Sequence, residues 1–179
     1  NYIDQAISTT NVKTLLGQVS GGSKNGNFKA YLNYAGFYGY DEGLNPSGLE
    51  SFTQLDLVLT DMINEKFNIG FNGTMQNRVQ IAGSPIENGS WYGAALYLNA
   101  APSSKIGLTL RSEFIIDSKE IYYNSENIFA NTLSLNYQIG PVTIIPEFRF
   151  EFAQSDNYYT KHDGLGTSST ATVLMAAVY

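Results

Sequence analysis

Val142-Thr-Ile-Ile-Pro-Glu-Phe-Arg-Phe-Glu-Phe152 is the stretch of this sequence that decides its fold. Successive side chains of a β-strand point to opposite faces, so this run predicts one aromatic and one charged face. The aromatic face carries Phe148, Phe150 and Phe152, and the charged face carries Glu147, Arg149 and Glu151. A soluble sheet could also bury the aromatic face, so this run alone predicts a strand but not its environment.

The same period-two alternation recurs along most of the chain. It predicts about nine strands, at 11–20, 28–40, 51–63, 67–80, 91–102, 106–118, 128–140, 142–155 and 170–179. Strands of soluble domains average about 5–6 residues, whereas a tilted strand that crosses a bilayer needs about 9–11. The predicted strands have the length that a membrane crossing requires.

The predicted connections alternate in length. Short ones fall at 21–27, 64–66, 103–105 and 140–141, and long ones at 41–50, 81–90, 119–127 and 156–169. Transmembrane barrels join their strands by tight periplasmic turns and longer outer loops, and soluble barrels have no reason to sort loops in this way. We therefore predict an all-β, antiparallel up-and-down transmembrane β-barrel.

Composition agrees with this prediction and excludes several classes of function. The 179 residues include 13 Tyr, 10 Phe and 17 Gly, and only 15% are charged. The absence of cysteine excludes disulfides and thiolate sites, and a formal net charge of −6 without a basic cluster argues against nucleic acid as a partner. No window of the sequence approaches the roughly 18 apolar residues of a transmembrane helix.

Alternation assigns side chains to the two faces of the predicted wall. The residues expected to line the lumen are Arg78, Arg111, Glu113, Glu147, Arg149 and Glu151, with Lys29, Tyr31 and Asn33 lining the same interior. Those expected to face lipid are Phe67, Ile69, Phe71, Leu108, Leu110, Phe148, Phe150 and Phe152. Pore water solvates charges that lipid would not. The inward charges could bias solute passage or pair with one another and stiffen the wall, and one group can do both.

Aromatic residues gather near the predicted strand ends. They are Phe37, Tyr38, Tyr40, Trp91, Tyr92, Tyr122, Tyr123, Tyr158 and Tyr159. Rings at the level of the lipid headgroups would explain this pattern.

The sequence carries no sign of catalysis, and we predict no enzyme activity, cofactor or metal site. His162, the one histidine, lies in the last long loop without partners at ligand spacing, so a solvated loop residue is expected. The loop acids Asp41, Glu42, Glu120 and Glu126 could bridge divalent cations at a lipopolysaccharide surface, although exposed loop acids usually do nothing specific.

Several motifs together resemble the OmpL-like β-barrel porin family (porin-2 type) of Gram-negative outer membranes. They include Leu32-Asn-Tyr34, Asn64-Glu-Lys-Phe67, Ser104-Lys-Ile-Gly-Leu-Thr-Leu-Arg-Ser-Glu113, Thr132-Leu-Ser-Leu-Asn-Tyr137 and Pro146-Glu-Phe-Arg-Phe150, with Lys13-Thr14 and Gly17 before them. The likeness covers nearly the whole chain but only the C-terminal part of a typical member. It implies a general porin without a cofactor, in the bacterial outer membrane. It also implies that Tyr179, ending the final strand, serves as an assembly signal, although a strand that merely ends on tyrosine is the simpler reading.

Strand counting predicts that residues 1–179 form one domain that is an N-terminally incomplete part of a larger barrel. A complete single-chain barrel has an even number of strands, and an open sheet would leave two unpaired edges in lipid. Two alternatives remain: Asn1–Thr10 is itself a tenth strand, or one of the nine strands is miscounted. The apolar positions of Asn1–Thr10 do not alternate, which favours a missing N-terminal portion.

Three functions compete at this point. The first is a porin that passes small hydrophilic solutes by passive diffusion, and the second is a scaffold barrel that anchors a larger outer-membrane assembly. The third, a soluble ligand-carrying barrel of lipocalin type, needs an apolar interior, which the inward charges oppose. The expected partners are outer-membrane lipid and lipopolysaccharide, with a homo-oligomer or a larger membrane complex left open.

Overall fold

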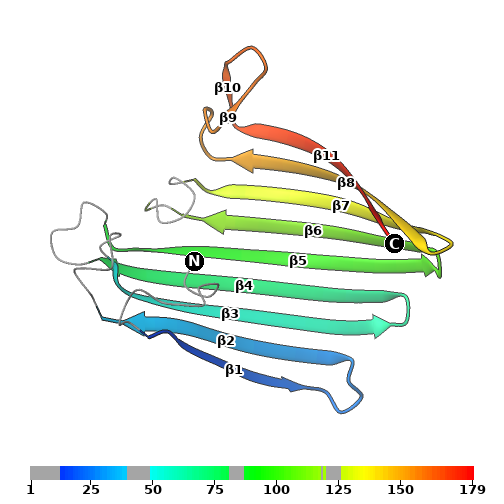
Figure 1. The fold of residues 1–179 in the computed structure, drawn as a ribbon, viewed down its shortest axis with the longest axis horizontal. Coiled ribbons are helices and arrows are strands. Elements are labelled where there is room, and N and C mark those ends of the chain that lie inside the picture. The colour runs from blue at the N-terminus through cyan, green and yellow to red at the C-terminus, as the bar shows by residue number, and fades with distance from the viewer. Residues whose placement is uncertain (1–12, 40–48, 81–86, 118, 120–125) are drawn as a thin grey trace.

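The main element of the described part of the chain is an antiparallel sheet of nine strands, in which each strand lies beside the one that precedes it in the sheet along the chain (Figure 1). The computed structural model describes residues 13–39, 49–80, 87–117, 119 and 126–179. The sheet consists of β1 (Leu15–Gly22), β2 (Phe28–Tyr38), β3 (Leu49–Asn64), β4 (Phe67–Gln80), β5 (Gly89–Ser103), β6 (Ile106–Ile116), β7 (Ile128–Ile139), β8 (Val142–Ala153) and β11 (Ser169–Val178). The predicted strands are confirmed, with their ends shifted by a few residues.

Connections of two kinds join the strands, as the sequence predicted. The tight turns 65–66, 104–105 and 140–141 lie at one end of the sheet, together with the turn at 23–27 (Figure 1). Gly140 has a φ of +58°, a conformation that other residues rarely adopt, and it lets β7 return as β8 within two residues. The strand ends that the longer connections join all lie at the opposite end of the sheet (Figure 1).

One feature of the long connection between β8 and β11 was missed in the sequence. It contains a short hairpin of β9 (Tyr159–Thr160) and β10 (Gly166–Thr167), which pair with each other and not with the main sheet. Two-residue strands are too short to produce a period-two pattern, so alternation could not reveal them. This hairpin stands beyond the ends of β8 and β11 (Figure 1).

The sheet has no hydrophobic core of the kind that a soluble protein builds. Among the described residues only four hydrophobic ones are buried, Phe37, Ala95, Ala130 and Ala153. Large apolar side chains are instead exposed on strand after strand, including Leu133 at 51% and Phe148 at 49%. A continuous apolar surface of this kind marks contact with a membrane or with another protein layer.

Barrel closure is not seen in the described part of the chain. β1 pairs only with β2, and β11 pairs only with β8, so these two strands are the edges of the sheet. The structure therefore confirms the all-β antiparallel meander but does not join its ends. Within the described ranges, no helix is long and apolar enough to cross a membrane.

Candidate functional site: the polar face of the sheet

The strand register divides the side chains between an apolar and a polar face. Glu113, Ala130 and Glu151 are direct neighbours across β6, β7 and β8, and Arg111, Thr132 and Arg149 form the next row on the same face. The six residues that we predicted to line a lumen all fall on this face, whereas the eight predicted to meet lipid fall on the other, where Leu110 for example faces Leu133. That the polar face encloses a lumen stays a prediction.

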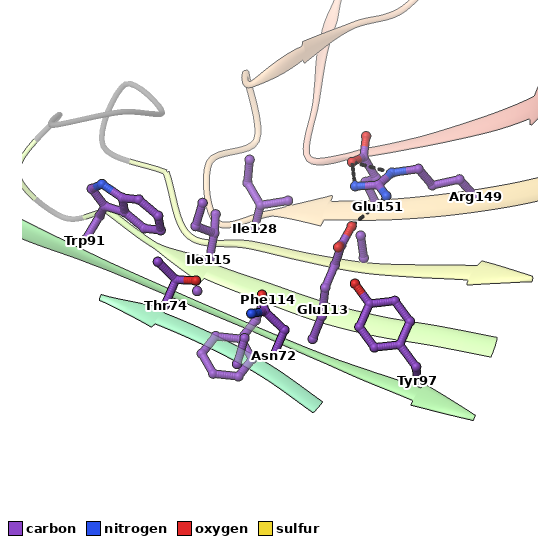
Figure 2. Close-up of a pocket in the computed structure, with 14 residues that line it drawn as sticks. Asn72, Thr74, Trp91, Tyr97, Glu113, Phe114, Ile115, Ile128, Arg149 and Glu151 are labelled. Atoms are coloured by element: carbon purple, nitrogen blue, oxygen red, sulfur yellow. Dashed lines mark hydrogen bonds and ion pairs between the residues drawn. The ribbon is translucent and has the colours of Figure 1, made fainter. Parts of the chain in front are cut away.

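Two arginines and two glutamates form a continuous ion-pair chain on the polar face, which we call the charged cluster. Arg111 Nη2 lies 2.9 Å from Glu113 Oε1, and Arg149 Nη1 lies 2.6 Å from the same oxygen. Arg149 Nη2 then contacts Glu151 Oε1 at 2.6 Å, as Figure 2 shows. Two positive and two negative charges leave the cluster neutral overall, and all four charged groups are paired with one another.

The charged cluster is partly shielded by its neighbours. Its side chains are 21–34% exposed. Arg149 Nη1 also donates to Thr132 Oγ1 at 3.3 Å, and Thr132 is 4% exposed. Partial removal from water strengthens these interactions relative to pairs on an open surface. The cluster is therefore a clamp across three strands of the polar face.

The two remaining predicted charges also have polar partners. Ser134 Oγ donates to Glu147 Oε2 at 2.8 Å, across β7 and β8. Arg78 Nε donates at 2.6 Å to Gln76 Oε1, an oxygen that also accepts a hydrogen bond of 3.2 Å from Trp91 Nε1.

A second polar network, not predicted from the sequence, centres on Asp56 in β3. Its carboxylate accepts hydrogen bonds from Asn33 at 3.0 Å, Asn72 at 2.8 Å and Thr74 at 2.6 Å. Asn33 in turn accepts one from Gln18 at 2.7 Å, so the network joins β1, β2, β3 and β4. Alternation could have placed Asp56 on the polar face, but only the register brings the polar groups of these four strands together.

Between the two networks the polar face is hollowed. A hollow of about 310 Å³ lies over β4 to β8. Its lining includes the small residues Gly93, Ala95 and Ala130, the rings of Trp91 and Tyr97, and the charged side chains of Glu113, Arg149 and Glu151 (Figure 2). Three of its polar lining residues were predicted as inward-facing, but the hollow and its two rings were not.

The structure divides the aromatic residues that we expected in one headgroup girdle. Tyr38 and Tyr92 lie on the apolar face and are exposed, as a girdle requires. Phe37 and Trp91 each immediately precede one of these tyrosines in the strand, so their side chains point to the polar face. Placing them in the girdle was therefore wrong. Tyr40, Tyr122 and Tyr123 lie outside the described residues.

Tyr159, from the β9–β10 hairpin, also turns toward the polar side. Its hydroxyl donates to Glu151 Oε2 at 3.5 Å, and its ring packs edge-to-face on Tyr158 with ring centres 4.9 Å apart. Burial, together with the negative charge of Glu151, raises the pKa of Tyr159 to about 12. The hairpin is thereby tied to the charged cluster.

The loop residues considered as ligands receive little support. His162 is exposed in the turn between β9 and β10, as expected. Glu126 is only 9% exposed and accepts a hydrogen bond from the Ser155 backbone N–H at 3.0 Å, so describing it as an exposed loop acid was wrong. Asp41, Glu42 and Glu120 lie outside the described residues, and among the described ones no group of acids and histidine could hold a metal ion.

Comparison with known proteins gives one match. The model of the family described as "Putative beta-barrel porin-2, OmpL-like" matches residues 3–179. Neither the curated proteins nor the solved structures contain a match.

Proposed function

The chain belongs to the putative β-barrel porin-2, OmpL-like family, and we propose that it forms part of the wall of a water-filled pore in the bacterial outer membrane. The observation that carries this proposal is the contrast between the faces of one sheet. One face exposes apolar side chains from nearly every strand, while the other gathers ions, amides and hydroxyls. A wall with lipid on one side and water on the other suits both faces.

The proposed activity is passive diffusion of small hydrophilic solutes, without catalysis or a cofactor. Outer-membrane lipid and lipopolysaccharide would contact the apolar face and the long connections. The direct test is single-channel recording of the purified full-length protein in planar bilayers. Discrete conductance steps are expected, and well-folded protein that gives none would instead favour a scaffold barrel.

The pore that we propose should discriminate weakly between ions. The paired charges Arg111, Glu113, Arg149 and Glu151 balance one another. Asp56 adds a negative charge, and its hydrogen-bond donors Asn33, Asn72 and Thr74 are neutral. Reversal potentials in a salt gradient should therefore stay near zero, with a small cation preference. Strong exclusion of either ion would contradict the mixed lining.

A closed pore also needs a strand partner for each edge of the sheet. Unpaired backbone groups in lipid cost several kcal/mol each, so β1 and β11 must find partners in the membrane. In our proposal additional strands complete a larger barrel. The alternative is that β1 and β11 pair directly with each other. Because this sequence contains no cysteine, a double variant with Val19→Cys in β1 and Val173→Cys in β11 can test it by disulfide cross-linking. Efficient cross-linking between these two positions within one molecule would show that β1 and β11 close the barrel on each other.

A further inference from the structure

The hollow on the polar face has the composition of a site for a sugar ring. We propose that it binds the pyranose ring of a neutral saccharide passing along the wall, an inference that rests on the pore function proposed above. Nothing in the family description assigns a ligand or a binding site to this face.

The size of the hollow sets the first limit on its ligand. At about 310 Å³ it stands at the lower end of the range found for small-molecule sites, which is roughly 300–1,000 Å³. This volume suits one ring rather than a long or branched molecule. Because the hollow is open to the polar side of the wall, a longer chain could extend beyond it.

The shape of the hollow comes from the residue sizes along β5. Trp91, Gly93, Ala95 and Tyr97 follow one another on the polar face of this strand. Two small residues thus lie between two large rings, which leaves a recess with an aromatic ring at each end (Figure 2). Trp and Tyr combine an apolar ring with a polar edge, and a pyranose likewise combines C–H faces with hydroxyl edges.

Hydroxyl recognition would come from the groups beside the rings. Glu113 and Glu151 supply carboxylate oxygens, and Asn72 and Thr74 supply an amide and a hydroxyl from β4. Carboxylates accept strong hydrogen bonds from O–H donors. They are held in place by Arg149, which bridges both acids at 2.6 Å and so fixes their orientation before a ligand arrives.

Charge balance argues for a neutral ligand over an ion. Arg149 is flanked by two acids, and Arg111 contacts one of them, so neither sign of charge dominates the recess. An anion would have to displace a glutamate from Arg149, and a cation would compete with the arginine. A polyhydroxyl ring can instead hydrogen-bond to the lone pairs that these ion pairs leave unused.

Trp91 gives this proposal a built-in reporter, because it is the single tryptophan of the sequence and it lines the hollow. The experiment titrates the full-length protein in detergent micelles with glucose and with maltotriose, and follows Trp91 emission. A saturable change at millimolar sugar is expected. Mannitol, which has the hydroxyls but no ring, should give at least tenfold weaker binding, and sodium sulfate should give none.

Two matched glycine variants test the location. A Cβ at Gly93 would meet its nearest neighbours at 3.6 Å, and a Cβ at Gly107 would also meet Asn136 at 3.6 Å, so both alanines fit the fold without a clash. Both glycines lie on the polar face, but only Gly93 lines the hollow. Gly93→Ala should weaken sugar binding about tenfold, as an extra methyl does in a fitted pocket, while Gly107→Ala should not change it.

The outcomes keep this inference separate from the pore function. Equal responses to glucose and mannitol, a stronger response to sulfate, or equal affinities in the two glycine variants would overturn the saccharide site. If the protein forms conducting channels but sugar neither reduces the current nor changes Trp91 emission, the saccharide site is refuted. The pore function would still stand in that case. A saturable Trp91 response in protein that never conducts would support the site and reject the pore.

Discussion

Glu113 on β6 and Arg149 on β8 meet at 2.6 Å across the strand that separates them. Ala130 of β7 lies between them on the same face, directly opposite Glu113 and Glu151 in the register, and is 1% exposed. Because alanine is short, the two long side chains can join above β7. The relationship depends on three strands at once and gives the wall a cross-strand clamp.

Enlarging Ala130 should break this clamp. In Ala130→Leu the added side chain would enter the space where Glu113 and Arg149 meet, and overpacking of this kind costs about 1–3 kcal/mol. Urea unfolding of the protein in lipid vesicles should show the loss. Ala171→Leu is the matched control because Ala171 is exposed on the apolar face of β11. Equal stability of the two variants would contradict the clamp.

A charge on the apolar face of β8 should hinder membrane insertion. Phe150 packs edge-to-face on Phe152, with ring centres 4.5 Å apart, on the face opposite Glu151. Phe150→Arg should cost about 2–4 kcal/mol if the site lies near the bilayer midplane. The fraction of folded protein recovered in vesicles, read from the heat-dependent shift in gel mobility, measures this cost.

Two variants control for the loss of the ring and for the gain of charge. Phe150→Leu keeps the position apolar and should insert almost normally. Thr170→Arg introduces the same charge on the polar face, directly opposite Glu151, and should also be tolerated. Normal insertion of Phe150→Arg would refute the lipid-facing assignment.

The ion pair between two long connections should give an acid-sensitive contact. Lys119 Nζ lies 2.9 Å from Glu87 Oε2, joining the β6–β7 connection to the β4–β5 connection. The hydrogen bond from Lys119, helped by its charge, lowers the pKa of Glu87 below 4.5. The contribution of the pair is therefore present above pH 4.5 and is lost as the pH falls through the lowered value.

Carboxyl NMR of the glutamate-labelled protein would measure this pKa directly. Lys119→Met should return the pKa of Glu87 toward its usual value. Lys105→Met, in a tight turn at the opposite end of the sheet, should leave it unchanged. A pKa of Glu87 that does not respond to Lys119→Met would show that the two side chains do not pair in solution.

The hydroxyl of Tyr159 should lose its proton at a higher pH than that of an ordinary tyrosine. Burial and the charge of Glu151 raise its pKa from 10.0 to about 12. The folded state thus holds this proton more tightly than the unfolded chain, so its contribution to stability is complete below pH 10 and is lost as the pH rises through about 12. The difference in tyrosinate absorbance between wild type and Tyr159→Phe isolates this residue.

Replacing Glu151 separates the causes of the shift. Glu151→Gln removes the negative charge next to the phenol, so the pKa of Tyr159 should fall but stay above 10.0, because burial is the larger cause. A pKa that is unchanged in Glu151→Gln would mean that the β9–β10 hairpin does not contact the charged cluster in solution.

The sequence by itself determined the strands, their antiparallel order and the side chains that share a face. These features follow from local rules: period-two alternation separates Phe150 from Glu151, and a two-residue turn such as 140–141 forces the next strand to run back beside the last. The same rules misplaced Trp91, because clustering near a strand end does not tell which face a ring occupies. They also missed β9 and β10, which are too short to alternate.

Only the tertiary structure decided which polar groups meet. The contact between Glu113 and Arg149 joins residues 36 positions apart and depends on the register of β7 as well as on the small size of Ala130. Likewise, Asn33 and Asn72 reach Asp56 only because three strands align their rows. A register shift of one residue in any of these strands would move every side chain of that strand to the other face of the sheet. Alternation therefore determined the chemistry of each face, whereas register across several strands, a nonlocal property, created the ion-pair chain and the hollow.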